Sequence, residues 1–167
     1  MNIFYLDKDM EKCAQYHVDK HCVKMIVESC QILSNAQHSK GTKKPPMKET
    51  HINHPCCVWA RESRQNYLWL CEFTLHLLIE YIYRYKRPNL KNVKSLFWLC
   101  DNIPDLPDIG LTEHAQGMKN KAPECLREGN PILAYRLFYI LHKNHIAKWK
   151  NRPIPHWYSE QFLLENF

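Results

Sequence analysis

The stretch that decides the fold is YHVDKHCVKMIVESCQILSN, residues 16–35. Apolar or small side chains fill most of it, and the polar ones recur every three or four residues, which is the period of an α-helix. We therefore predict a long early helix over residues 17–36. Its polar side chains form one narrow stripe: His17, His21, Lys24, Glu28, Gln31 and Asn35. With apolar neighbours on both sides, this stripe is expected to line a cleft; the alternative is a narrow solvent-facing edge.

Helices are also expected in the rest of the chain, over residues 10–16, 56–85, 89–102 and 130–150. Each begins at residues that favour helix starts: Asp9, Pro55, Asn89 and the pair Asn130-Pro131. The helix over residues 56–85 is either one long helix or bent once. Residues 2–6, NIFYL, are the only strand candidate. The predicted fold is mainly α, a single compact helical domain over residues 1–167 with irregular loops and an aromatic C-terminal tail.

Composition limits the classes of function. The chain has 167 residues, 45% of them hydrophobic, and a net charge of +6. This fits one domain with a substantial core and a modest attraction for polyanions, so DNA is the first partner to consider. No apolar run is long enough for a membrane span, and the start of the chain lacks the pattern of a secretory signal. We expect a cytoplasmic protein, in the cytoplasm of the host if a phage encodes it, whose eight cysteines are reduced.

The stripe is the strongest candidate for catalysis. Paired histidines beside a carboxylate are unusual on a solvated helix face, and a carboxylate in a cleft is suited to moving protons. The sequence therefore assigns acid/base work to Glu28, with His21 and Lys24 as helpers. His17 and Gln31, on the same line, are expected to contact the substrate.

Two other regions could bind a substrate. The entry to the helix over residues 56–85 carries residues suited to phosphate or carboxylate: His51, His54, Arg61 and Arg64. The segment HKNHIAKWKNRPIPHWY, residues 142–158, interleaves basic and aromatic residues that can neutralise phosphates and stack on unpaired bases. Within this segment, Trp157 is expected to bind the substrate. The lysines of residues 40–48 add a second basic patch.

A metal site is the main rival among enzymes. His17 and His21 form an HxxxH pair that could join His51 and His54 around zinc, as in a metal-dependent hydrolase. No HExxH and no CxxC fixes such a geometry, so we expect no metal and no cofactor. A third hypothesis is a non-catalytic module that binds nucleic acid.

The order of features resembles the small phage-type pyrimidine-dimer DNA glycosylases, the ultraviolet-repair endonucleases. The resemblance rests on DKHCVKMIVES (residues 19–29), on the basic loop and long aromatic helix, and on RPIPHWY (residues 152–158). In that family an Asp-x-His on the first long helix is followed, seven residues after the histidine, by the catalytic glutamate. Asp19, His21 and Glu28 have this spacing.

The resemblance implies a DNA repair enzyme that works on a flipped nucleotide as glycosylase and lyase. The family nucleophile is the N-terminal α-amine, which attacks the sugar C1′, forms an imine and breaks the backbone by β-elimination. It would here belong to Met1, or to Asn2 after removal of Met1, with Glu28 as the acid/base group. Two positions depart from the family: Asn2 disfavours Met1 removal, and Val27 stands where the family has Arg. Lys24 is an alternative imine-forming amine, provided that burial favours its neutral form.

Overall fold

The computed structural model describes residues 1–87, 90–158 and 164. Six α-helices and two 3₁₀ turns follow one another in the described residues, which contain no strand. Their bounds are α1 Met10–Gln15, α2 Asp19–Lys40, α3 Pro55–Glu62, α4 Arg64–Tyr85, α5 Val93–Asp101, η1 Pro123–Cys125, α6 Pro131–His142 and η2 Asn144–Ile146. The predicted mainly α fold is therefore confirmed.

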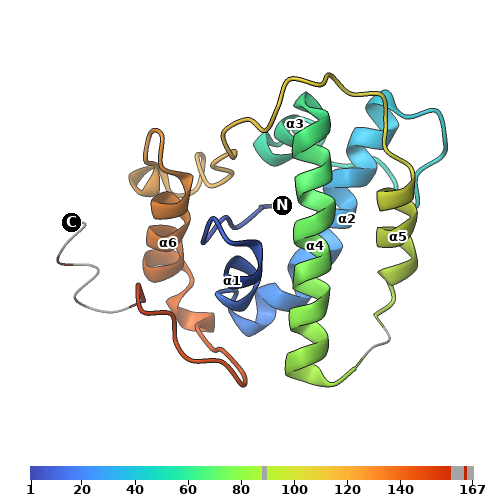
Figure 1. Cartoon of the computed structure of the whole chain (residues 1–167). Helices are drawn as coiled ribbons and strands as arrows, with labels where there is room; N and C mark the ends of the chain where they lie inside the picture. Colours follow the sequence, from blue (N-terminus) through green and yellow to red (C-terminus); the bar gives the residue numbers. More distant parts are fainter. Residues whose placement is uncertain (88–89, 159–163, 165–167) are drawn as a thin grey trace.

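The two longest helices, α2 and α4, pack side by side and carry the core. Helices α3 and α5 pack against the same pair, and α1 packs against α4 (Figure 1). The strand candidate, residues 2–6, is an unpaired extended segment that enters the middle of the molecule, as Figure 1 shows. Its Phe4 and Leu6 are buried in the core, where Phe4 stacks on His21 of α2 and on Phe138 of α6. The start of the chain is thereby fixed in the interior.

Most predicted helix starts are confirmed, but some bounds differ. Asp9 accepts hydrogen bonds at the start of α1, and Asn130 accepts one from the N–H of Leu133 at the start of α6. The expected helix over residues 56–85 breaks at Ser63, whose extended backbone (φ −140°, ψ 145°) ends α3 and whose hydroxyl caps α4. The apolar period of the sequence continues across Ser63, so this pattern could not predict the break.

The last two helices are shorter than expected. Helix α6 stops at His142 rather than near residue 150, because the following polar residues form the 3₁₀ turn η2 and an extended segment. Helix α5 begins at Val93; Asn89, its predicted cap, lies outside the described residues. A long irregular segment, residues 103–122, then crosses from α5 to the α6 side of the molecule (Figure 1).

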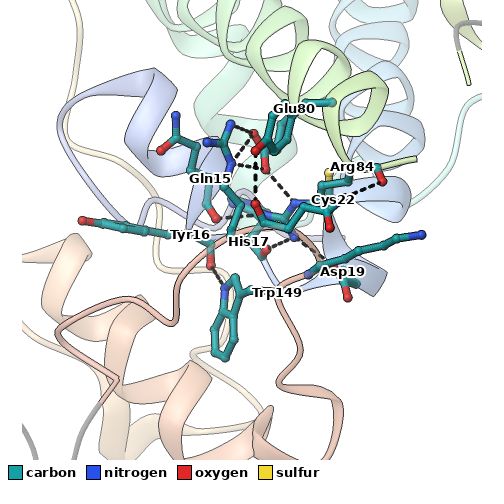
Figure 2. Close-up of polar contacts among 12 residues, drawn as sticks. Gln15, Tyr16, His17, Asp19, Cys22, Glu80, Arg84 and Trp149 are labelled. Atoms are coloured by element: carbon teal, nitrogen blue, oxygen red, sulfur yellow. Dashed lines mark hydrogen bonds and ion pairs between the residues drawn. The ribbon is translucent and has the colours of Figure 1, made fainter. Parts of the chain in front are cut away.

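A buried ion-pair network fixes the bend between α1 and α2. Arg84 of α4 is fully buried and donates to Glu80 at 2.6 Å, to Asp19 at 2.9 Å and to the backbone carbonyls of Gln15 and His17 at 2.8 Å (Figure 2). Asp19 also accepts the N–H of Lys150 at 2.8 Å. One guanidinium thus joins α4, the α1–α2 bend and the C-terminal segment, and it sets where α2 begins.

Most of the cysteines lie in the core. All eight are free, and seven of them are buried. Burial raises the pKa of Cys13, Cys22 and Cys30 to about 12, so these side chains behave as small apolar groups of the core. No helix in the described residues is both long and apolar enough to cross a membrane.

Candidate active site

Glu28, in the middle of α2, lies where the start of the chain meets that helix. Its Oε2 accepts the backbone N–H of Asn2 at 3.0 Å and lies 3.8 Å from the α-amine of Met1. Its Oε1 pairs with Nζ of Lys24, one turn earlier, at 3.2 Å. The carboxylate is 16% exposed and the Met1 side chain 7%, whereas Lys24 is 67% exposed. One largely buried carboxylate therefore holds two amines.

The N-terminal half of the stripe faces the core. His17 is fully buried, and its Nδ1 lies 2.7 Å from the carbonyl oxygen of Cys13. His21 is stacked on Phe4, with ring centroids 4.4 Å apart, and its Nδ1 lies 2.8 Å from the hydroxyl of Tyr139. Burial lowers the pKa of His17 to about 4 and that of His21 to about 3, so both rings are neutral at pH 7. A substrate could reach His17 only if the core opened.

The C-terminal half of the stripe holds a loop. Gln31 donates to the carbonyl oxygen of Lys48 at 2.7 Å, and Asn35 exchanges hydrogen bonds with the backbone of Thr50 at 2.6 and 3.1 Å. The helix face that sequence analysis treated as one cleft wall therefore has three parts: a buried end, the carboxylate with its amines, and an anchor for residues 41–54.

That anchored loop leads to His51 and His54. His51 is exposed and has a left-handed backbone, φ 51°. His54 caps α3, since its Nδ1 accepts the N–H of Cys56 at 3.2 Å. Burial, the positive charge of the Met1 amine and the nearby His51 lower the pKa of His54 to about 4. Of the two histidines, the described contacts bring His54 into the surroundings of Met1 and Glu28.

The other predicted binding residues lie elsewhere. Arg61 donates to the carbonyl oxygen of Ile52 at 2.5 Å, and exposed Arg64 lines a pocket with Gln37 and Asp101, away from Glu28. Trp157 is 1% exposed and packs its ring edge-on against Tyr16. A base could stack on Trp157 only after that packing was broken.

Sequence analysis missed two lysines near the site. Burial lowers the pKa of Lys143, and the charges of Lys121 and Lys24 lower it further, while Glu28 opposes them. Lys121 is exposed and also acts on His54. Lys143 follows α6 and Lys121 precedes η1, so both are distant from Glu28 in sequence. No local pattern could have found them, because only the fold brings these segments together.

Gly117 allows a close approach of three segments. A side chain on Gly117 would overlap the amide oxygen of Asn2 and would place its Cβ 3.0 Å from both Cε1 of His54 and Sγ of Cys56. The N–H of Gly117 donates to the hydroxyl of Tyr135 at 3.0 Å. The segment around Gly117 thus backs the start of the chain and the entry to α3 at once.

An open pocket of about 540 Å³ is lined by neighbours of these residues in the sequence. Its lining includes Pro55, directly after His54, and Gln116, directly before Gly117. Its size falls within the range of small-molecule sites.

The four histidines proposed for zinc do not converge. Among the described residues, the one group of three ligand-type side chains with ligand atoms within 4.8 Å of one another is Glu124, Cys125 and His142. Nε2 of His142 is already paired with Glu124 Oε1 at 2.5 Å. Among the residues that the structure describes, no cluster of histidines therefore supports the rival prediction of a metal-dependent hydrolase.

The described residues thus form a helical protein in which an α-amine lies beside a largely buried carboxylate. The sequence model of the family described as pyrimidine dimer DNA glycosylase matches residues 1–92, more than half of the chain. The chain belongs to this family. No curated protein and no solved structure matches it.

Proposed function

We propose that this DNA glycosylase family member uses the α-amine of Met1 to attack C1′ of a damaged nucleotide and then cleaves the strand as a lyase. The observation that carries the proposal is the 3.8 Å separation between the Met1 nitrogen and Glu28 Oε2. This separation exceeds a hydrogen bond, so we infer that the two groups draw together, or are bridged by one water, when DNA binds; the carboxylate can then remove a proton from the amine and return it to the sugar.

The proposed reaction has two bond-breaking stages. In the first, the amine lone pair forms a C1′–N bond, the glycosidic bond breaks, and its electron pair leaves with the base nitrogen. The C1′–O4′ bond then opens to give an imine, while Glu28 carries the proton lost by the amine to O4′. In the second, loss of a C2′ proton expels the 3′ phosphate, and water hydrolyses the imine to restore the amine.

Met1 is the better candidate for the nucleophile than Lys24. An α-amine ordinarily titrates near pH ~7.7–8.0 and a lysine near ~10.4, so an α-amine needs less help to lose its proton. Lys24 is 67% exposed, and its ammonium lies 3.2 Å from Glu28 Oε1. The burial that an imine-forming Lys24 needs is absent from this position.

The surroundings of Glu28 are suited to DNA. Lys121, Lys24 and Glu28 all act electrostatically on Lys143, so positive charge gathers near this carboxylate, and the chain as a whole has a net charge of +6. Lysines that repel one another at a surface attract anions, so we expect these to bind the phosphates on either side of the reacting sugar. The pocket lined by Pro55 and Gln116 does not include Glu28 or Met1, but it has space for part of a nucleotide that has left the base stack.

Borohydride trapping tests the proposal. Reduction of an imine on duplexes with an abasic site or a pyrimidine dimer should yield a covalent protein–DNA adduct, and peptide mapping should place it on Met1. An adduct on Lys24 would show a different nucleophile. Absence of an adduct on both duplexes, with DNA binding retained, would instead favour a non-catalytic DNA-binding module.

A further inference from the structure

His54 has a fixed tautomer. It stands at the N-cap of α3, where its Nδ1 accepts the N–H of Cys56 at 3.2 Å. A neutral imidazole whose Nδ1 accepts a hydrogen bond carries its proton on Nε2. The ring is therefore oriented by α3 and presents an N–H donor at its far side.

That donor has no partner among the described residues, and the ring does not titrate near neutral pH. Nε2 makes no hydrogen bond to any described residue. Burial and the adjacent positive charge of the Met1 amine hold the pKa of His54 at about 4. At pH 7 the ring can donate a hydrogen bond, but it has no extra proton to release.

The ring also lies close to the start of the chain. His54 Cε1 and the amide oxygen of Asn2 approach the same side of Gly117, where a Cβ would crowd both. The backbone N–H of Asn2 is bonded to Glu28. The electrostatic effects of the Met1 amine and Glu28 on His54 agree with this placement. His54 thus borders the space in which the proposed amine attack takes place.

We propose that Nε2–H of His54 donates a hydrogen bond to O4′ of the sugar that the amine attacks. The inference rests on the proposed function and adds one substrate contact to it. When the C1′–O4′ bond breaks, its electron pair stays on O4′, and a donor already in place stabilises that developing charge. Glu28 supplies the proton that O4′ finally takes, and His54 keeps its own.

The variant His54→Asn isolates this role. Asparagine is a strong N-cap residue, so the start of α3 keeps its acceptor while the ring donor is lost. We expect the rate of borohydride-trapped adduct on an abasic duplex to fall about 10²-fold. The fall should have the same size at every pH between about 6 and 8, because a neutral donor adds no titration there. DNA affinity and the urea midpoint should stay near the wild-type values.

The matched control is His76→Asn, which makes the same exchange on α4 beside the pocket formed with Glu11 and Glu80. It should trap at the wild-type rate. If His54→Asn unfolds at a lower urea concentration than wild type, His54→Ser takes its place, because serine is also a strong N-cap residue.

Several outcomes would overturn the inference. If both His54 variants formed the adduct at the wild-type rate, the proposed hydrogen bond from His54 to O4′ would be wrong. A loss seen on base-bearing DNA but not on an abasic duplex would place the donor on the departing base instead of O4′. An equal loss of DNA affinity and rate would make His54 a phosphate contact. Absence of any wild-type adduct would overturn the proposed function itself, and the O4′ contact with it.

Discussion

At the scale of single residues, Glu28 combines tasks that sequence spacing alone does not separate. One oxygen pairs with Lys24, and the other holds the Asn2 N–H beside the Met1 amine. The stripe predicted Glu28 and Lys24 as neighbours because a helical period fixes that geometry. It could not predict that His17 points into the core, because a period gives a direction on the helix but not what packs there.

Glu28→Gln should slow trapping strongly while leaving the fold intact. Glutamine keeps the shape of the side chain and its Oε1 can accept the Asn2 N–H, but it cannot carry a proton from the amine to the sugar. The trapping rate should fall about 10²- to 10⁴-fold. DNA affinity should stay close to wild type, measured by fluorescence anisotropy on an abasic duplex. Full turnover by this variant would remove Glu28 from the mechanism.

At the scale of elements, local signals predicted helix starts better than helix ends. Asp9 and Asn130 act as predicted because a cap is a contact within a few residues. The break at Ser63 depends instead on more distant contacts: its hydroxyl donates to the carbonyl of Gly110 at 2.6 Å, and the N–H of Arg64 to that of Pro107 at 2.9 Å. Those partners come from the long segment after α5, which no window around residue 63 contains.

The bend between α1 and α2 should depend on Arg84. Arg84→Met removes a fully buried guanidinium from Glu80 and Asp19 and leaves two backbone carbonyls without that donor. Breaking a buried pair from one side typically costs about 3–5 kcal/mol. We expect a loss of that size in the free energy of unfolding, measured with urea.

Arg152→Met is the matched control for that measurement. Arg152 also pairs with Glu80, at 2.8 Å, but its side chain is 23% exposed and Arg84 would still hold the carboxylate. Its loss of stability should be clearly smaller. Equal effects of the two substitutions would show that burial of Arg84 adds nothing.

At the scale of the whole molecule, the basic surface predicted from sequence is partly engaged in internal contacts. Lys43, although exposed, donates to Asn102 at 2.6 Å, and Arg152 is bound to Glu80; Lys44 and Lys48 are exposed too. DNA affinity should fall steeply with salt. Lys44→Ala and Lys48→Ala should each reduce the slope of log K against log salt by about 1, and Arg152→Ala by less. Anisotropy titrations across sodium chloride concentrations measure the slope; a value near zero for wild type would contradict DNA binding through phosphates.

The buried histidines should make the whole fold sensitive to acid. Burial lowers the pKa of His17 and His114 to about 4 and that of His21 to about 3, whereas an unfolded histidine titrates near ~6.5. Between these values the unfolded chain binds protons that the native protein does not, so the free energy of unfolding falls as pH falls from about 6.5 to about 4. Each histidine contributes a slope of up to ~1.4 kcal/mol per pH unit.

The urea midpoint should accordingly be lower at pH 5 than at pH 7, and His114→Phe tests the cause. His114 is stacked on Tyr5, with centroids 3.8 Å apart, and meets Trp69 edge-on at 4.3 Å, so phenylalanine keeps the aromatic contacts and removes one titrating group. The variant should lose less stability than wild type between pH 7 and pH 5. A free energy of unfolding that stayed the same at pH 7 and pH 5 in both proteins would contradict this prediction. It would mean that His17, His21 and His114 bind protons as readily in the native protein as in the unfolded chain.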